Sequence, residues 1–301
     1  MGIKRNRKII IVVGPTASGK SDLAVEIAKD FNGEIISADS RQVYKNMDLG
    51  TGKITKKEMR EIPHHLLDIA SPKRRFTVAQ FKKRAFLKIK QIYKRNKIPI
   101  ICGGTGFYIQ AIIKNLEIPK VKPDLKLRKK LEKETTESLF KKLRTLDPKR
   151  AKTIDSHNKR RLIRALEIII KTGKPVPRLK KKQAFNPLYI GIKKDSQELK
   201  NLIKKRLIKR IRGGLIAEVK NLRKIGVSWK RLDDFGLEYR YVSRYLKGEI
   251  NKQEMVEELE KEIIKYAKRQ MTWLKKYPGK KVHWIKNYNQ AKKLIKNFLS
   301  F

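Results

Sequence analysis

The 301-residue sequence has a single cysteine, Cys102, and lacks any long apolar run. One cysteine excludes both a disulfide framework and a cysteine-rich zinc site, and it suits a reducing compartment. Because Cys102 ends the apolar run IPIIC, we interpret it as a buried strand residue. No apolar run approaches the roughly 20 residues of a membrane span. The short apolar run near the start leads into a glycine-rich loop without a cleavage-type segment. We therefore predict a cytoplasmic protein with no membrane anchor.

Acidic residues are scarce relative to basic ones. Lys and Arg number 77 against 29 Asp and Glu, which gives a formal net charge of +48. A field of that sign attracts the phosphates of a nucleic acid or an anionic membrane surface. A general compositional bias towards lysine on solvated helix faces would produce a similar excess, and the composition alone leaves both explanations open. We favour nucleic acid as the partner, because several arginines cluster.

The stretch GPTASGKS, residues 14–21, follows the apolar run KIIIVV and fits the phosphate-binding pattern G-x4-G-K-[ST]. Its glycines let backbone N–H groups surround a phosphate, and the N-terminal end of the following helix adds positive potential. Lys20 can reach the terminal phosphate, and the Ser21 hydroxyl can hold Mg²⁺. The predicted phosphate-binding loop consists of Gly14, Pro15, Thr16, Ala17, Ser18, Gly19, Lys20 and Ser21.

The order of apolar segments predicts an α/β fold with a P-loop-type core, a parallel sheet flanked by helices, and a helical insertion. Strands are expected at Lys8–Val13, 34–37, Ile98–Cys102, 188–193 and 281–286, with helices at 18–29 and 77–96 and polar loops before Thr77. Residues 125–172 are helical and very basic, and residues 195–276 are nearly all helical. We predict a core made of residues 1–119 and 186–301 and a basic insertion at 120–185.

Two further stretches follow predicted strands. Asp39 stands at the carboxyl end of the strand 34–37, where open α/β sheets place ligands. It could contact a metal indirectly or accept a proton, although a capping Asp in a turn has the same pattern. Ser40, Arg41 and Gln42 carry groups that bind phosphates or base edges, as many exposed loops do. Thr105 lies in GGTG, where glycines permit close approach to a ligand, but an ordinary strand–helix turn would look alike.

The stretch NKRRLIRALEI, residues 158–168, carries three arginines on the side of a helix opposite to its apolar stripe: Arg160, Arg161 and Arg164. Arg160 and Arg164 are four residues apart and share a face. Like charges stacked in this way repel, so a bound polyanion would account for them. Spacing alone does not single out Arg128, because the whole insertion is basic.

Taken together, the motifs resemble the tRNA dimethylallyltransferase (isopentenyltransferase) family. They are GPTASGKS, ISADSRQVYKNMDLGTGK, PHHLLDI, GGTGFYI, RRLIRALEI and YAKRQMTWLKK, in this order, and the resemblance runs from about Ile9 to Lys276. Absence of the zinc-finger extension of eukaryotic relatives points to the bacterial type. Two places differ from the family pattern: residues 236–239 read GLEY instead of Gly-Tyr-Lys/Arg-Glu, and Gly52 replaces a commoner Ala.

The resemblance implies a reaction and its cofactor. A dimethylallyl group would pass from dimethylallyl diphosphate to N6 of the adenine 3′ to the anticodon (position 37) of tRNA, with Mg²⁺ on Ser21 assisting the release of diphosphate. Asp39 is expected to be the general base, with Thr105 and Lys20 at the reacting centre. The residues 14–21 would bind the diphosphate together with Arg128.

The resemblance also implies which residues contact tRNA, in a protein that we expect to be a monomer. The target adenine must leave its stack to enter such a site. The implied contacts are Asp39, Ser40, Arg41, Gln42, Thr105, Arg128, Arg160, Arg161, Leu162, Ile163 and Arg164.

Other functions remain open at this point. A nucleoside or small-molecule kinase would use the same loop, but it would need ATP and no large basic insertion. A nucleotide triphosphatase would usually also show an apolar strand ending in Asp, whereas the strand IPIIC is followed by glycines. A non-enzymatic or ATP-driven RNA-binding protein would explain the charge, but not Asp39 and Thr105 beside the loop.

Overall fold

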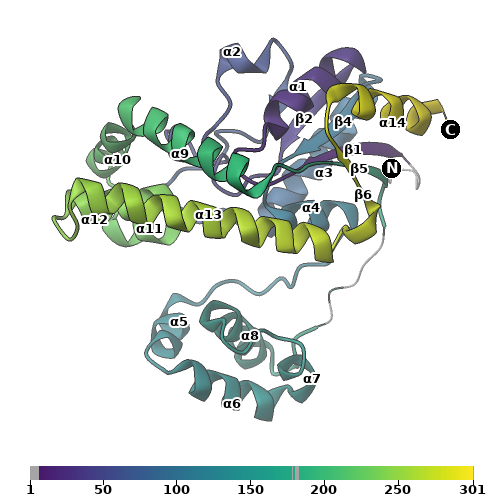
Figure 1. Cartoon of the computed structure of the whole chain (residues 1–301). Coiled ribbons are helices and arrows are strands. Elements are labelled where there is room, and N and C mark those ends of the chain that lie inside the picture. Colours follow the sequence, from purple (N-terminus) through teal and green to yellow (C-terminus); the bar gives the residue numbers. More distant parts are fainter. Residues whose placement is uncertain (1–6, 178, 180–182, 301) are drawn as a thin grey trace. The chain divides into compact units, whose positions relative to one another are not determined.

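The computed structural model describes residues 7–177, 179 and 183–300. The chain forms two compact units (Figure 1). The first unit combines the residues up to Asn115 with those from Gln183 onwards, and the second lies between them in sequence. The sequence placed the two boundaries after residues 119 and 185, four and three residues further along the chain.

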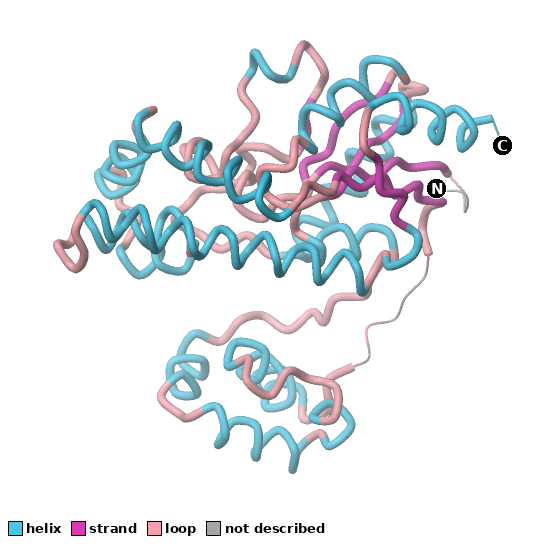
Figure 2. The backbone as a smooth tube through the Cα atoms, viewed as in Figure 1, coloured by secondary structure: helices cyan, strands magenta, loops and turns pink. Residues whose placement is uncertain are grey.

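The first unit is built on a sheet with the strand order β3-β2-β4-β1-β5-β6, in which every neighbouring pair is parallel. Figure 2 shows these strands between helices. The described strands are β1 (Lys8–Val13), β2 (Gly33–Ser37), β3 (His64–His65), β4 (Ile98–Cys102), β5 (Asn186–Ile192) and β6 (Val282–Ile285). The prediction of a parallel α/β fold is confirmed. The expectation of loops up to Thr77 was wrong at β3, because a two-residue strand leaves no apolar alternation in the sequence.

Helices cover both faces of this sheet because its central strands are apolar on both sides. In β1 every residue from Ile9 to Val13 is fully buried. One face packs against α3 (Val78–Lys94), α4 (Gly106–Ile113) and the end of α13 (Lys252–Lys276). The other face packs against α1 (Lys20–Asp30) and α14 (Tyr288–Ser300).

The first unit has further helices, and those with buried residues pack against loops that follow its strands. These helices are α2 (Lys56–Met59), α9 (Ser196–Arg212), α10 (Leu215–Lys224), α11 (Trp229–Phe235) and α12 (Leu237–Leu246), and a 3₁₀ helix spans Gly279–Lys281. Val43, Tyr44 and Met47 join an apolar cluster with α10–α12. Ala17 of the phosphate-binding loop joins another with α9 and α13. These clusters fix both loops to helices from the C-terminal half of the chain.

The second unit is a small helical body with its own core. It contains α5 (Leu125–Glu132), α6 (Thr136–Leu146), α7 (Pro148–Ala151) and α8 (Lys159–Thr172). Its core includes Leu139, Leu143, Leu162 and Leu166. The described part of this unit contains no strand, in agreement with the helical pattern of residues 125–172.

Candidate active site

Three loops meet at one edge of the sheet. Strands β2, β4 and β1 are consecutive neighbours and parallel, so their carboxyl ends lie side by side. The phosphate-binding loop follows β1, Asp39 follows β2, and the glycine-rich turn 103–106 follows β4. Parallel open sheets place their ligands at this edge. The structure therefore brings Lys20, Asp39 and Thr105 to a common site.

The phosphate-binding loop has the curled shape that an anion site requires. A Cβ on Gly14 would lie 2.7 Å from Ser18 Oγ and 2.9 Å from the Ile192 carbonyl oxygen, so only glycine fits there. Ala17 and Gly19 both have positive φ, 64° and 86°, as in backbone nests that turn N–H groups towards an anion. The Ser18 hydroxyl is buried without a hydrogen-bond partner among the described residues. A ligand oxygen would satisfy this hydroxyl, and the loop therefore fits a phosphate or diphosphate.

Lys20 lies among charges of both signs. Its amino group donates to the Pro15 carbonyl oxygen at 3.2 Å. Burial lowers the pKa of Lys20, and Asp39 raises it, whereas Arg206 and Arg210 of α9 lower it further. An incoming diphosphate would stabilise the charged form of all three cations. The sequence analysis missed Arg206 and Arg210, although their i,i+4 spacing is the signal that singled out Arg160 and Arg164.

Asp39 begins a tight turn and keeps one oxygen for other partners. Its Oδ1 accepts hydrogen bonds from the backbone N–H of Arg41 at 2.8 Å and of Gln42 at 3.4 Å. Its Oδ2 accepts no hydrogen bond within the described part of the chain. The turn geometry of Asp39 and a proton-accepting role are thus compatible, because they use different oxygens.

Thr105 ties the glycine-rich turn to the Asp39 turn. Its Oγ1 accepts the Ser40 N–H at 3.0 Å, and its own N–H donates to the Ala38 carbonyl oxygen at 3.1 Å. A Cβ on Gly103 would lie 2.4 Å from that carbonyl oxygen, so the two turns touch through backbone atoms. Asp39 and Thr105 are therefore held in one rigid arrangement.

Arg41 and Gln42 are both engaged within the first unit. The Arg41 guanidinium lies 5.5 Å from the Phe235 ring centroid and donates to the Asp234 carbonyl oxygen at 3.4 Å. The Gln42 amide donates to the Gly52 carbonyl oxygen at 3.1 Å and accepts the Ser37 hydroxyl at 3.0 Å. Contacts of Arg41 and Gln42 with tRNA stay a prediction. In the structure, the hydrogen bond from Gln42 to Gly52 holds the loop that ends near Lys53.

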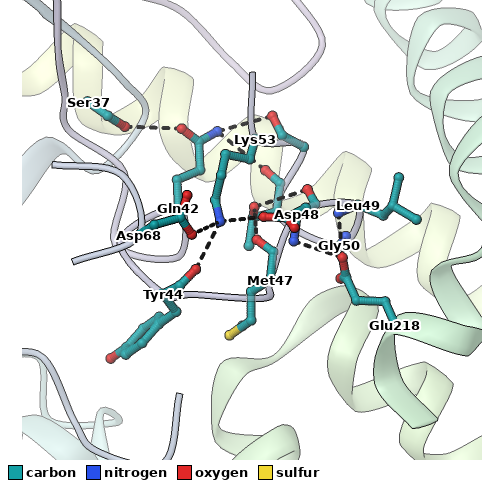
Figure 3. A network of polar contacts seen from close by, with 12 residues as sticks. Ser37, Gln42, Tyr44, Met47, Asp48, Leu49, Gly50, Lys53, Asp68 and Glu218 are labelled. Atoms are coloured by element: carbon teal, nitrogen blue, oxygen red, sulfur yellow. Dashed lines mark hydrogen bonds and ion pairs between the residues drawn. The ribbon is translucent and has the colours of Figure 1, made fainter. Parts of the chain in front are cut away.

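Figure 3 shows the polar network that holds this loop. Glu218 of α10 accepts the backbone N–H groups of residues 48, 49 and 50 at 2.7–3.0 Å and the Tyr239 hydroxyl at 2.8 Å. Lys53 is almost fully buried and donates to Asp48, Asp68 and the Tyr44 carbonyl oxygen. One carboxylate and one ammonium group thus fix the loop from opposite ends. Sequence reasoning could not find Glu218, because its partners lie about 170 residues away.

The two departures from the family pattern meet at Arg210. Its Nη1 donates to buried Glu238 at 2.8 Å, and burial raises the pKa of Glu238 while Arg210 lowers it. A Cβ on Gly52 would lie 1.9 Å from Arg210 Nη2, and Gly52 has a positive φ of 57°. The glycine at position 52 and the Glu at position 238 therefore define the place of one guanidinium, next to Lys20.

The second unit holds the other predicted residues, and two of its arginines pair with one buried carboxylate. Arg128 donates from Nε and Nη2 to the two oxygens of Glu167, at 2.7 Å each. Arg164 also donates to Glu167, which is fully buried, and to the Val121 carbonyl oxygen at 3.0 Å. Burial raises the pKa of Glu167, but its hydrogen bonds outweigh this and hold that pKa below its usual value. The proposed contacts of Arg128 with diphosphate and tRNA, and of Arg164 with tRNA, stay predictions.

The stretch RRLI divides between core and surface. The side chains of Leu162 and Ile163 are 0% and 6% exposed and belong to the core of the second unit, so they offer no side-chain surface to tRNA. Arg161 has 64% of its side chain exposed and lies 4.0 Å from Asp155. Arg160 is exposed as well, so the predicted tRNA contacts fit the two arginines better than Leu162 or Ile163.

The residues at the site fit a magnesium ion bound together with a phosphate or diphosphate ligand. Among the residues that the structure describes, no three His, Cys, Asp or Glu side chains form a metal cluster. Mg²⁺ usually keeps several waters and takes only one or two protein ligands beside substrate phosphates. The Ser21 hydroxyl at the start of α1 and the nearby Asp39 carboxylate match that pattern.

No helix within the described ranges is long and apolar enough to cross a membrane.

The sequence and fold are similar to those of known proteins. A family model described as IPP transferase matches residues 42–277. The tRNA dimethylallyltransferase of Thermoanaerobacter sp. (strain X514) is 44% identical over 305 residues, which cover 98% of this chain and 97% of that protein.

Two solved structures match nearly the whole chain. The full-length tRNA isopentenylpyrophosphate transferase of Bacillus halodurans has a TM-score of 0.72 at 36% identity, covering 98% of this chain and 96% of that one. A eukaryotic dimethylallyltransferase acting on tRNA has a TM-score of 0.82 at 26% identity, covering 98% and 80%. The TM-scores show that both share the fold described above. This chain belongs to the IPP transferase family, and the resemblance found in the sequence is confirmed.

Proposed function

We propose that this protein transfers the dimethylallyl group of dimethylallyl diphosphate to N6 of the adenine 3′ to the anticodon (position 37) of tRNA and releases diphosphate. The relatives named tRNA dimethylallyltransferase support this activity. The observation that carries it is the meeting of the phosphate-binding loop, Asp39 and Thr105 at one edge of the sheet. This arrangement offers an anion site beside a proton acceptor, which a displacement of diphosphate by an amine needs.

In the proposed reaction the adenine N6 attacks C1 of the dimethylallyl group, and the C1–O bond breaks. Asp39 accepts the proton that N6 loses, as a general base within hydrogen-bond reach. Diphosphate leaves with the bonding electron pair, and its charge is stabilised by the loop N–H groups, Thr16, Ser18 and Lys20. Thr105 holds the Asp39 turn in place through Ser40. When bound at Ser21, Mg²⁺ would neutralise part of the charge on the leaving group.

The basic second unit is the part that we propose grips tRNA phosphates, with Arg161 and its neighbours on α8 contributing. We place the enzyme in the cytoplasm, where its substrate is found, and expect it to act as a monomer. Arg206 and Arg210 join Lys20 in binding the diphosphate in this proposal, since all three charges share one region.

The activity is tested by mixing the protein with labelled dimethylallyl diphosphate, Mg²⁺ and unmodified tRNA, with and without ATP. We expect label on adenine in both mixtures. A strict need for ATP, with phosphate transfer in place of prenyl transfer, would support a kinase and overturn the proposal.

The role of Asp39 is tested with Asp39→Asn, which keeps an Oδ1 for the Arg41 and Gln42 N–H groups but cannot accept the proton. We expect kcat to fall by about 10²- to 10⁴-fold with tRNA affinity unchanged. The control is Asp30→Asn, at the end of α1 that lies away from the phosphate-binding loop. This variant should keep full activity. If Asp39→Asn is also fully active, the general-base role is wrong.

A further inference from the structure

Gln270 of α13 connects two of the three loops at the site. Its side-chain amide is nearly buried, with the whole residue 7% exposed. Oε1 accepts the backbone N–H of Thr16 at 2.8 Å, and Nε2 donates to the Gly104 carbonyl oxygen at 3.2 Å. These partners lie 254 and 166 residues away in sequence. One side chain thus bridges the phosphate-binding loop and the turn that carries Thr105.

The bridge is tight, because α13 packs directly onto the glycine-rich turn. A Cβ on Gly104 would lie 2.0 Å from Gln270 Nε2, and a Cβ on Gly106 would lie 2.2 Å from the Trp273 ring. On the other side of the bridge, Ala17 packs in an apolar cluster with Ala267. Neither loop has room to shift relative to this helix without breaking these contacts.

The chemistry of the bridge requires an amide. The Thr16 N–H needs an acceptor and the Gly104 carbonyl needs a donor. Both are backbone groups, so neither can take the other role. A carboxylate would satisfy Thr16 but repel the Gly104 oxygen, and an apolar side chain would leave both groups unpaired.

We propose that Gln270 is a positioning residue that sets the spacing between the diphosphate held by the loop and the Thr105–Asp39 arrangement. This inference rests on the proposed function, since the spacing matters for a nucleophile and a leaving group that must face each other. Small misplacements of reacting groups are costly to rate. The residue itself need not touch either substrate.

The test compares Gln270→Glu with Gln270→Met. At pH 8 the introduced carboxylate keeps the Thr16 bond and opposes the Gly104 carbonyl, and we expect kcat to fall about tenfold or more. The introduced carboxyl is buried and faces the Gly104 carbonyl oxygen, and both effects raise its pKa above the usual value of about 4.3. As the protonated form becomes populated towards pH 5.5, it can accept from Thr16 and donate to Gly104, so activity relative to wild type at the same pH should recover in part. Gln270→Met has a similar size and neither bond, and its loss should be the same at both pH values.

The control is Gln253→Glu, on the exposed side of the same helix, where the wild-type amide donates to Glu257. It should match wild type at both pH values. Binding of inorganic diphosphate with Mg²⁺, measured by calorimetry, gives a second readout that does not depend on prenyl transfer. We expect Gln270→Glu to bind it more weakly at pH 8 and with partly restored affinity at pH 5.5.

The two proposals can fail separately. If wild type binds diphosphate but transfers no prenyl group, the proposed function fails while the binding data still test Gln270. If Gln270→Glu and Gln253→Glu behave alike, or if Gln270→Met keeps the wild-type kcat and diphosphate affinity, the positioning role is wrong.

Discussion

Acid should weaken this protein in a way that can be traced to one carboxylate, Glu34 of β2. Glu34 is 2% exposed. Its oxygens accept hydrogen bonds from Arg95 at 2.7 and 3.0 Å and lie 2.6 Å from His65 Nε2, with Lys97 at 3.5 Å. Burial opposes ionisation of Glu34, but the bonds from Arg95 and His65 outweigh it and lower its pKa from 4.5 to about 2.

This depressed pKa sets the size and sign of the effect. A lowering by about 2.5 units corresponds to about 3 kcal/mol of stability above the unfolded-state pKa, and about 2 kcal/mol of it is lost between pH 6 and pH 3. The stabilisation is complete above pH 4.5 and disappears as the pH falls towards 2, because the folded state must then bind a proton that it resists. Since β2 leads into Asp39, the same carboxylate anchors the strand that positions the proposed general base.

The assay is denaturant unfolding of wild type and Glu34→Gln at a series of pH values from 6 to 3. Other carboxylates titrate in both proteins, so the difference between the two isolates Glu34. We expect the variant to be less stable by several kcal/mol at pH 6, because it leaves Arg95 and His65 without their carboxylate. The difference should shrink by about 2 kcal/mol at pH 3. A difference that stays constant over this range would refute the reasoning.

Three other substitutions test the loop network and the second unit. Glu218→Gln cannot accept all four of its hydrogen bonds, so amide hydrogen exchange at residues 48–50 should quicken and stability should drop by about 1–3 kcal/mol; unchanged exchange would contradict the role of Glu218. Arg161→Ala should weaken tRNA binding and reduce its salt dependence by about one phosphate contact, whereas Arg164→Ala should mainly lower the thermal stability of the second unit by depriving Glu167 of a partner. The two arginine variants could instead weaken tRNA binding equally, with no loss of stability in either. That result would contradict the distinct structural role given to Arg164 by its pairing with Glu167.

The parts of the fold that could be predicted are those encoded over short stretches. The continuous apolar run of β1 followed by the loop 14–21 indicates strand, anion site and helix together. Because the carboxyl ends of parallel strands share an edge, Asp39 and Thr105 could be expected near that loop. The sequence also predicted that Leu162 lies on an apolar stripe, and its side chain belongs to the core of the second unit.

The rest depends on contacts between distant segments. Gln270 and Glu218 reach backbone groups about 170 to 250 residues away, and no local pattern marks their partners. The pairing of Arg128 with Glu167 was hidden in the same way, since one residue lies on α5 and the other on α8. The Arg164–Glu167 pair, at i,i+3 on one helix, did carry a local signal in its charge spacing, as did Arg206 and Arg210 at i,i+4.

The division of the first unit into two sequence segments determines the order in which the protein can be completed during synthesis. Strand β1 is central, between β4 and β5, yet β5 begins at Asn186, after the whole second unit has been translated. Until then one edge of β1 has no neighbour, and an unpaired apolar edge invites aggregation of the nascent chain. The second unit makes its core from residues close in sequence, so it can fold before β5 is synthesised. The length of the insertion therefore sets how long the edge of β1 in the nascent chain stays unpaired and open to aggregation.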